Sequence, residues 1–291
     1  MRVLVTGIGG FVGGHVARHF AERGHSVTGI VHRSRPADPQ SFASLEIVQT
    51  DLAGTGPLPV SGPHDAVVHC ASALPSNVRD EAELVRINVE GSRQVFEYAR
   101  TAGVRTVIYC SSMAAFGTVD ADVVDLQTPV VAPGAYGRSK LEGERLLADI
   151  AGSGPLRALS VRLPGVVGRG SHDNFLSGVM AAILKDQPVT GRNPGAPFNN
   201  IVHVADLAAF FADLLTTLPP GHRMTTIAAA MPITIGKAIS LLYATAGRPE
   251  RASYEMGGRP FTISPEPARA LGYRVPDTAD SLRRFALDAL R

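Results

Sequence analysis

Three glycines near the start of the chain constrain its fold more than any other feature. Gly7, Gly10 and Gly13 follow an apolar, strand-like run at residues 2–6 and precede an amphipathic helical pattern at 11–23. Glycines at this spacing permit a tight turn, close approach of the backbone to a pyrophosphate, and close packing of the helix on the strand. The N-terminus of the helix directs unpaired N–H groups toward such phosphates. The chain is therefore expected to begin with a dinucleotide-binding strand-turn-helix unit.

Short β-branched runs and longer helical patterns continue to alternate along the chain. They predict strands at 2–6, 26–31, 45–48, 66–70, 106–111 and 158–163, and helices at 11–23, 81–101 and 136–151. Several of these strands are apolar almost throughout, as expected when helices cover both faces of a parallel sheet. A stretch rich in Gly and Pro at 54–63 is expected to be a loop in place of a crossover helix. We therefore expect an α/β fold, a Rossmann-type doubly wound parallel sheet with its site at the carboxyl ends of the strands.

The pattern loosens after residue 169. A helix is expected at 175–185, a turn-rich segment at 191–198, and a further helix at 207–215 with Asp206 as its N-cap. Pro and Gly interrupt the remainder, which is expected to form a small C-terminal substrate lobe. The expected division is an NAD(P)-binding Rossmann domain at 1–168, completed by about 199–229, and a substrate-binding lobe at 169–198 and 230–291.

Composition excludes several classes of partner. A formal net charge of +2 over 291 residues is too small to indicate nucleic acid or an anionic membrane surface. No apolar run is long enough to span a membrane, and no signal peptide precedes the first strand, so a cytoplasmic protein is expected. Cys70 and Cys110 lack metal-ligand spacing. They are expected to be small apolar residues at strand ends rather than a disulfide or metal ligands, and no metal is expected.

The end of the second strand bears on the choice of cofactor. A carboxylate there binds the ribose hydroxyls of NAD, whereas a basic neighbour suits the additional phosphate of NADP. The sequence continues from Val31 as His32-Arg33-Ser34-Arg35, with no carboxylate at the strand end. Arg33, helped by His32 or Arg35, is expected to bind that phosphate through charge-assisted hydrogen bonds. This favours NADP over NAD, with a solvated basic loop as the alternative.

A second group of residues carries candidate chemistry. Ser111 and Ser112 end the strand at 106–111, and Tyr136 and Lys140 lie near the start of the helix at 136–151. Residues four apart share one face of a helix, so the Lys140 ammonium can lie beneath the Tyr136 phenol. A nearby positive charge favours the phenolate form, as acid–base catalysis requires. A Tyr-x-x-x-Lys pair alone is also compatible with exposed helix decoration.

Taken together, these features resemble the extended branch of the short-chain dehydrogenase/reductase superfamily, the NAD-dependent epimerase/dehydratase family. The resemblance covers nearly the whole chain. It rests on the order of several motifs along the chain. In the first half these are the TGxxGxxG loop at 6–13, the adenine-side acidic pair at Asp51-Leu52, the segment His69-Cys70-Ala71-Ser72, and Asn88. In the second half they are the SSxxxYG-like strand end at 111–117, Tyr136 with Lys140, the segment Arg162–Gly168, and a late marker at 200–207.

The resemblance implies roles for individual residues. Ser112 would hydrogen-bond the substrate oxygen, Tyr136 would donate or accept the proton, and Lys140 would hold a cofactor ribose hydroxyl. For Asn88, a helix-bending or water-holding role stands beside a catalytic one. The cofactor-binding set implied is Gly7, Gly10, Phe11, Val12, Gly13, His32, Arg33, Asp51, Leu52, Cys70, Ala71, Ser72, Asn88, Ser111, Tyr136, Lys140, Pro164 and Val166. The helices at 81–101 and 136–151 would pair in a homodimer.

Two departures from the family pattern bear on the substrate. Relatives that act on nucleotide sugars often carry an arginine just before the late marker, where this chain has the uncharged Asn199. Arg259, in Gly258-Arg259-Pro260, resembles the second phosphate-binding arginine of the family, with a solvated loop arginine as the alternative. Ser112, Tyr136, Asn199 and Arg259 are the candidate residues for contact with a small-molecule substrate.

The residues after Ser112 bear on the type of reaction. Dehydratases carry an acidic pair there, and Met113 and Ala114 cannot transfer protons. The expected function is therefore a reductase or dehydrogenase acting on a keto or hydroxyl carbon of a sugar, nucleotide sugar or similar molecule, with NADP as cofactor. The alternatives are a nucleotide-sugar epimerase with tightly bound NAD, and a non-catalytic NAD(P)-binding protein.

Overall fold

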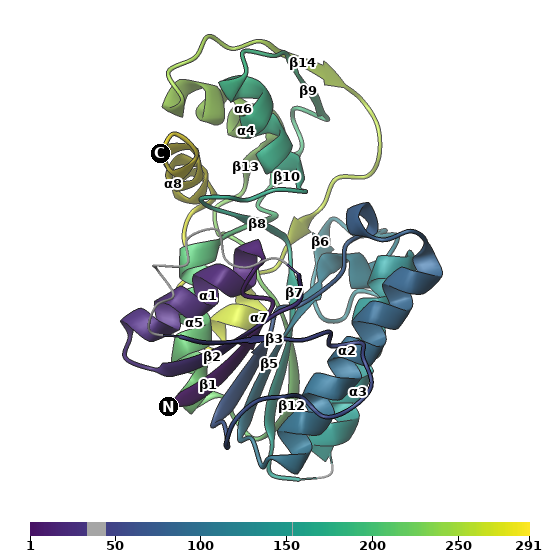
Figure 1. The fold of residues 1–291 in the computed structure, drawn as a ribbon. Coiled ribbons are helices and arrows are strands. Elements are labelled where there is room, and N and C mark those ends of the chain that lie inside the picture. The colour runs from purple at the N-terminus through teal and green to yellow at the C-terminus, as the bar shows by residue number, and fades with distance from the viewer. Residues whose placement is uncertain (34–44, 153) are drawn as a thin grey trace. The chain divides into compact units, whose positions relative to one another are not determined.

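The computed structural model describes residues 1–33, 45–152 and 154–291 (Figure 1). The chain divides into two compact units. The first comprises Met1–Thr118, Val130–Arg162 and Leu207–Thr225. The second comprises Val119–Pro129, Leu163–Asp206 and Thr226–Arg291.

A seven-stranded sheet forms the centre of the first unit. Its strands, in spatial order, are β12 (Gly221–Thr226), β7 (Arg157–Leu163), β5 (Thr106–Ser112), β4 (Ala66–His69), β1 (Arg2–Thr6), β2 (Ser26–Val31) and β3 (Glu46–Gln49). The pairs β3–β2, β2–β1, β1–β4 and β4–β5 are all parallel. The chain runs outward from β1 through β2 and β3, then returns to continue from β4 on the other side of β1. A crevice for a ligand is expected at this reversal, outside the carboxyl ends of β1 and β4.

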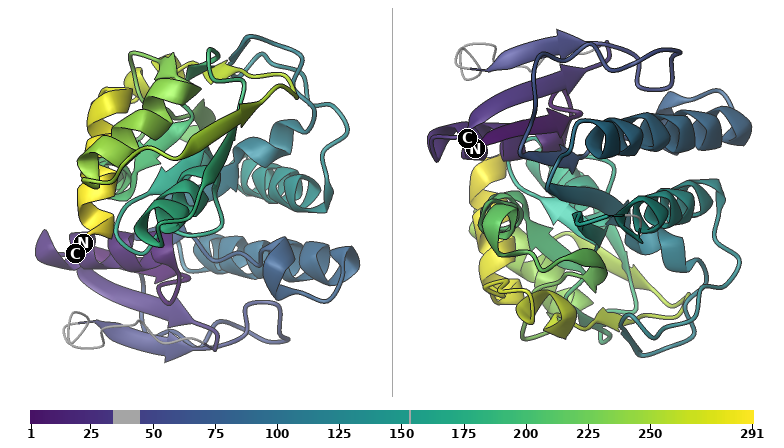
Figure 2. Two further views of the ribbon diagram at one scale, coloured as in Figure 1. Left: turned by 90° about the horizontal axis from the view of Figure 1, so that it is seen from above. Right: turned by 90° about the horizontal axis from the view of Figure 1, so that it is seen from below.

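Helices cover both faces of this sheet. The helices α2 (Glu81–Thr101) and α3 (Ala135–Gly152) pack together on one face, and α1 (Phe11–Glu22) lies on the other with the part of α5 (Val204–Thr217) that belongs to this unit (Figures 1 and 2). Apolar side chains fill the layer beneath α2 and α3, among them Val67, Phe96 and Leu147. The expected doubly wound α/β sheet is confirmed.

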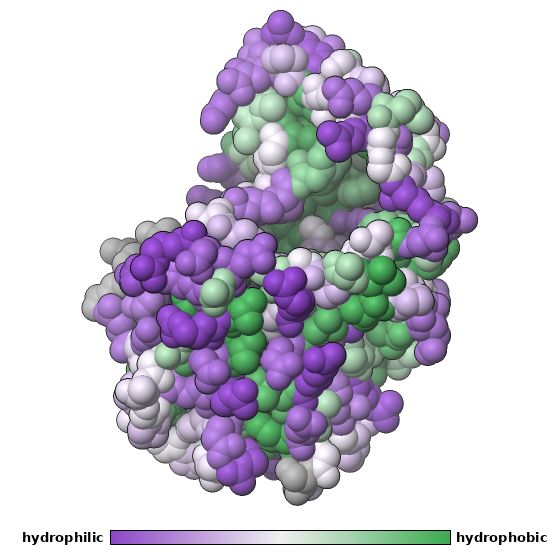
Figure 3. Space-filling model, turned by 90° about the vertical axis from the view of Figure 1, so that its right-hand side faces the viewer, coloured by the Kyte–Doolittle hydropathy of each residue, from purple (hydrophilic) through white to green (hydrophobic). Residues whose placement is uncertain are grey.

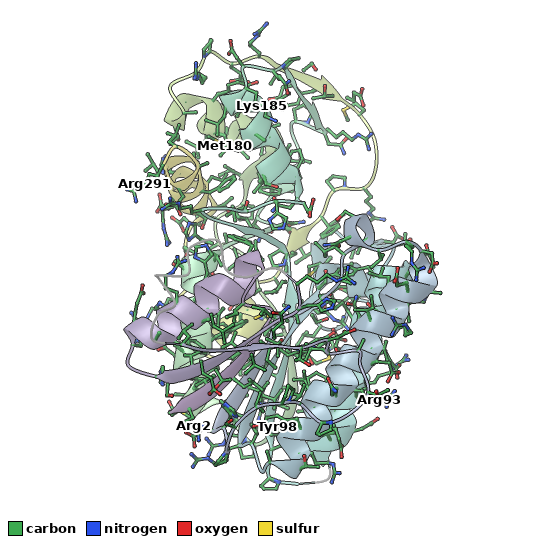
Figure 4. All side chains as sticks on the ribbon, viewed as in Figure 1. Arg2, Arg93, Tyr98, Met180, Lys185 and Arg291 are labelled. Carbon is green, nitrogen blue, oxygen red and sulfur yellow. The ribbon has the colours of Figure 1, made fainter. Side chains whose placement is uncertain are left out.

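The connection from β3 to β4 forms no helix, as the Gly and Pro content of residues 54–63 predicts. Without a crossover helix, this loop and α2 line an open hollow of about 630 Å³. Arg93 and Tyr98, which are labelled on α2 in Figure 4, line it.

The second unit contains short strands and four helices among its described residues. The strands are β6 (Val123–Val124), β8 (Gly165–Val167), β9 (Val189–Arg192), β10 (Pro197–Phe198), β11 (Ile201–His203), β13 (Ile233–Thr234), β14 (Ala252–Glu255) and β15 (Thr262–Ile263). The helices are α4 (Phe175–Leu184), α6 (Ile235–Thr245), α7 (Glu266–Arg269) and α8 (Thr278–Ala289). The strands pair two by two, so the unit is held together by a core between α4, α6 and α8 that includes Met180, Ile239, Leu242 and Phe285.

The start of α5 differs from the expectation. The helix begins at Val204, so Asp206 lies in its first turn and is not its N-cap. The ring of His203 accepts the Ala205 N–H at 3.3 Å instead. The Asp206 carboxylate accepts two hydrogen bonds from Arg284, at 2.7 and 2.8 Å, and this pairing with α8 explains its position.

None of the helices in the described part of the chain combines the length and apolar character needed to cross a bilayer.

Candidate active site

The glycine loop leaves no room for side chains. Gly7 has a φ of +74°, and a Cβ atom there would lie 2.8 Å from the backbone nitrogen of Ala71, two residues after the end of β4. A Cβ atom on Gly13 would lie 2.3 Å from the Gly7 carbonyl oxygen. The loop is therefore packed tightly against both α1 and the segment after β4, and no side chain fits at Gly7 or Gly13.

The N-terminus of α1 is suited to an anion. Gly10 is the N-cap and supplies no side-chain acceptor, and the first turn, which begins Phe11-Val12-Gly13, contains no acidic residue. The N–H groups of a first helical turn have no partners within the helix, and they carry the positive end of its dipole. The tight glycine cradle and this helix end fit a pyrophosphate.

Polar side chains at the ends of β2 and β3 are exposed. Val31 is buried, and His32 and Arg33 after it are open to solvent, as a contact with a cofactor phosphate would require. Arg35 lies outside the described residues. Asp51 is exposed and its carboxylate accepts the Ala53 N–H at 2.9 Å.

Asn88 on α2 ties the loop after β4 to α3. Its Oδ1 accepts the Ala73 N–H at 2.7 Å and the Ser72 hydroxyl at 3.3 Å. Its Nδ2 donates to the Ser139 hydroxyl at 3.0 Å. Because Asn88 is buried and all of its hydrogen bonds go to protein atoms, it holds Ser72 and the start of α3 in a fixed relation.

Lys140 is buried beneath Tyr136. Its Nζ donates to the Cys110 carbonyl at 2.9 Å and lies 5.5 Å from the centroid of the Tyr136 ring. Burial opposes the charge on this ammonium, but the ionisable hydroxyl and thiol groups around it, with Tyr109 first, outweigh burial and raise its pKa. The ammonium is therefore charged at neutral pH and is placed to stabilise a phenolate on Tyr136.

Ser112 lies at the carboxyl end of β5, where the strand turns into a short 3₁₀ helix at Met113–Phe116. Its Oγ accepts the Ala114 N–H at 3.1 Å, which fixes the side chain. Ser112 and Tyr136 are both half-buried, so both reach solvent as groups that meet a substrate must.

Lys140 also packs against a buried cluster of aromatic rings. The Tyr109 ring is fully buried, and Lys140 Nζ lies 5.1 Å from its centroid. His69 stacks on Tyr109 at 5.5 Å between ring centroids, and Phe96 packs edge-on against both. Burial, and then the charge of Lys140, lower the pKa of His69 to about 3. The imidazole is therefore neutral, and Lys140 is the cation of this cluster.

A buried ion pair fixes the strand end behind Ser112. Glu144, one turn after Lys140 on α3, accepts two hydrogen bonds from Arg162 of β7 at 2.8 and 2.9 Å. It also accepts the Ser111 hydroxyl at 2.5 Å. The Arg162 guanidinium lies over the Phe116 ring at 4.3 Å. Sequence reasoning missed Glu144, although a carboxylate four residues after Lys140 on the buried face of the helix was a signal.

The remaining candidates belong to the second unit. Pro164 and Val166 are half-buried, and Val166 lies in β8 opposite Val202 of β11. The Asn199 side chain is buried and bonded to the backbone of Ala229 and Ile263 at 2.8 to 2.9 Å. The amide nitrogen donates both of its hydrogens, and the amide oxygen accepts one, within the second unit.

Arg259 has carboxylate partners. Its guanidinium pairs with Asp120 and, at 3.4 Å, with Asp122. All three side chains are about half exposed or more, so the pair is weak and an anion could displace either carboxylate.

Comparison with known proteins decides the family. The family model described as the NAD dependent epimerase/dehydratase family matches residues 3–226. The chain belongs to this family.

Individual members of the epimerase/dehydratase family resemble the chain over most of its length. A D-erythronate dehydrogenase from Cupriavidus necator is 27% identical, over 99% of this chain and 98% of that protein. A UDP-glucose 4-epimerase from Azospirillum brasilense is 27% identical, over 71% of this chain and 66% of that protein. The solved structure of MoeE5 in complex with UDP-glucuronic acid and NAD has a TM-score of 0.84 at 24% identity, covering 100% of this chain and 98% of that one.

These findings make the chain an NAD(P)-dependent enzyme of the extended short-chain dehydrogenase/reductase type, an oxidoreductase or an epimerase. The chain departs from the SSxxxYG pattern of the family at one residue. Phe116 stands where the pattern has tyrosine, and its ring packs against the Arg162 guanidinium rather than presenting a hydroxyl.

Proposed function

We propose that the chain is an NADP-dependent reductase or dehydrogenase that acts on a keto or hydroxyl carbon of a sugar, a nucleotide sugar or a similar small molecule. The observation that carries the proposal is the buried Lys140 ammonium, held between the Cys110 carbonyl and the Tyr136 ring at the carboxyl ends of the strands. The D-erythronate dehydrogenase, matched over nearly the full length of both chains, supports dehydrogenase chemistry on a small polyhydroxy compound.

The nicotinamide, when bound, supplies or accepts the hydride. Tyr136 donates a proton to the substrate oxygen during reduction and removes it during oxidation. Lys140 stabilises the resulting phenolate and binds a ribose hydroxyl of the cofactor. Ser112 Oγ accepts the Ala114 N–H and keeps its own proton available, and it donates this proton to the substrate oxygen to hold that oxygen in line for transfer.

The glycine loop and the N-terminus of α1 bind the pyrophosphate in this proposal. Asp51 and Leu52 lie on the adenine side, and Arg33, with His32, binds the additional phosphate of NADP. The support for NADP is the exposed Arg33 together with the absence of a carboxylate at the end of β2. Ala71, Ser72 and Ser111 border the cofactor, and Asn88 positions that border rather than reacting.

A nucleotide-sugar epimerase is the second candidate. UDP-glucose 4-epimerases occur among the relatives, and the structure of MoeE5 contains NAD. In that case Arg259 would exchange its carboxylate partners for a diphosphate, and the hydride would return to the opposite face of the same substrate.

An activity assay separates the two. The protein is incubated with NADPH and a panel of keto sugars and keto acids, and loss of the absorbance of the reduced nicotinamide is followed. In parallel, UDP-glucose is supplied without added cofactor, and formation of UDP-galactose is measured. Oxidation of NADPH that depends on a carbonyl compound supports the reductase. Formation of UDP-galactose, with no NADPH oxidation, supports the epimerase.

We also infer a homodimer formed through α2 and α3. Half-buried apolar side chains occur on both helices, including Val85 and Val89 on α2 and Leu141 and Ala148 on α3. Figure 3 shows apolar groups among polar ones on this face. Sedimentation at micromolar concentration should give the mass of two chains, and a single-chain mass would contradict the inference.

A further inference from the structure

The two cysteines of the chain lie side by side. Cys70 follows β4 and Cys110 lies in β5, and the parallel register of these strands, with His69 opposite Tyr109, places the cysteines opposite each other. Their sulfur atoms are 3.5 Å apart, and both thiols are free. Neighbouring strands are about 4.8 Å apart, which is within the range of Cα separations that a disulfide requires. A bond between the two sulfurs therefore needs only a local adjustment.

The two thiols differ in access. Cys110 is 5% exposed, whereas Cys70 is partly exposed and is the more accessible residue of the two. Its hydrogen bond to Cys110, and then burial, raise the pKa of the Cys70 thiol well above its ordinary value. Little thiolate is present at neutral pH, so attack by Cys70 on an oxidant is slow there and becomes faster as the pH rises.

We propose that Cys70 and Cys110 are a modification site, at which a peroxide converts the two thiols into an intramolecular disulfide that weakens cofactor binding. Cys70 attacks one peroxide oxygen, the O–O bond breaks, and a sulfenic acid and water (hydroxide from a thiolate) result. The Cys110 sulfur then attacks the Cys70 sulfur and displaces the hydroxyl as a second water. Two thiols lose two electrons and one peroxide gains them. Because Cys110 lies at contact distance, the sulfenic acid does not persist.

The strand ends that carry these sulfurs also carry the cofactor crevice. The residue after Cys70 is Ala71, whose N–H donates to Thr6 at 3.1 Å and whose backbone packs against Gly7. The Cys110 carbonyl is the acceptor for Lys140. Shortening the sulfur separation to about 2 Å shifts both contacts. This effect on cofactor binding rests on the proposed function, whereas formation of the disulfide does not.

Intact-mass spectrometry after treatment with hydrogen peroxide tests the modification. Because the chain has two cysteines, one intramolecular disulfide lowers the mass by two hydrogen atoms and leaves no thiol for alkylation. We expect this product to form faster at higher pH and to be reversed by dithiothreitol. The variants Cys70→Ala and Cys110→Ala should instead gain oxygen or remain unchanged. Stable oxygen adducts on Cys70 or Cys110 of the wild-type chain, located by peptide mapping to separate them from oxidised methionines such as Met231 and Met256, would overturn the proposal, as would unreacted thiols.

The consequence is tested by NADPH titration of the oxidised and reduced forms. Loss of about one hydrogen bond in the crevice weakens binding about tenfold, and each cysteine variant, compared with its own untreated form, should show no change. A disulfide that leaves the affinity unchanged would overturn the regulatory part of the proposal. If the reduced protein binds no nicotinamide cofactor, the proposed function fails, and the mass measurement still decides whether the disulfide forms.

Discussion

The Nζ atom of Lys140 lies between two aromatic rings, 5.5 Å from the centroid of Tyr136 and 5.1 Å from that of Tyr109. Tyr109 is fully buried, whereas Tyr136 reaches solvent. The buried ring and the Cys110 carbonyl hold the ammonium in place, and the half-exposed phenol is the group free to exchange a proton with a substrate. This asymmetry is the physical basis for assigning acid–base chemistry to Tyr136.

The substitution Tyr136→Phe removes the exchangeable proton and keeps the ring above Lys140. We expect turnover to fall by about 10²- to 10⁴-fold, the usual contribution of general acid–base catalysis, while NADPH binding is retained. Steady-state rates and a fluorescence titration of NADPH give the two quantities. Tyr254→Phe, at an exposed tyrosine of the second unit, is the matched control. Near-normal turnover by Tyr136→Phe would show that another group transfers the proton.

The substitution Arg33→Ser should weaken NADPH and leave NADH nearly unaffected, because only NADPH carries the additional phosphate. A charge-assisted hydrogen bond contributes about 1.5–3 kcal/mol, or roughly ten- to a hundredfold in Kd. Arg93→Ser, at an exposed position on α2, is the control for loss of a positive charge. Equal loss of affinity for both cofactors would contradict the assignment of Arg33 to the phosphate.

Gly13→Ala tests the close packing of the glycine loop. The added methyl group would lie 2.3 Å from the Gly7 carbonyl oxygen, so the loop must move and cofactor binding should be largely lost. Gly178→Ala on α4 is the contrasting variant, because a Cβ atom there has open space around it. It should stabilise the helix by about 0.5–1 kcal/mol. Full cofactor affinity in Gly13→Ala would show that the loop is not a tight cradle.

The buried pair of Glu144 and Arg162 should appear as coupling in a double-mutant cycle. Each of Glu144→Met and Arg162→Met leaves one buried charge without its partner and should lower the free energy of unfolding by about 3–5 kcal/mol. The double variant removes both charges and should be less destabilised than the sum of the two. Denaturant unfolding of the four proteins measures this, and strictly additive losses would show that the pair does not act as a unit.

His69 predicts how stability depends on pH. Its pKa is lowered from 6.5 to about 3 in the folded protein, first by burial and then by Lys140. As the pH falls below 6.5, the unfolded chain binds a proton that the folded chain excludes, so stability is lost progressively down to about pH 3.

The pKa values of His64, His203 and His222 are also lowered, so these histidines act in the same direction and the test is a difference between proteins. His69→Gln should lose stability less steeply between pH 6 and 4, because its unfolding takes up about one proton fewer than unfolding of the wild type. His172→Gln, at an exposed histidine, should retain the wild-type slope. Identical slopes for His69→Gln and the wild type would contradict a neutral, buried His69.

The elements around the site were predictable because their signals are local. Gly7, Gly10 and Gly13 each meet a requirement set by residues close in sequence or by the adjacent strand, and the four-residue spacing of Tyr136 and Lys140 determines that they share a helix face. The strand from 106 and the helix at 81–101 were recognisable from apolar periodicity alone.

The parts that sequence reasoning missed depend on distant partners. The side chain of Asp206 is suited to N-capping, but it pairs with Arg284 of α8. The His203 ring accepts the Ala205 N–H at the start of α5 instead. The role of Asn88 depends on Ser139, fifty-one positions later in the chain. The two-residue strands of the second unit have no periodicity to detect, because a pair of residues cannot show alternation.

The nicotinamide cofactor itself tests the central claim most directly. The freshly purified protein is denatured and any released cofactor is identified, and untreated protein is titrated with NADPH and with NADH. We predict a protein that is purified without stoichiometric NAD and binds NADPH much more tightly than NADH, which would direct the substrate search to carbonyl compounds. Stoichiometric release of NAD, with no preference for NADPH, would contradict the account and would favour an epimerase.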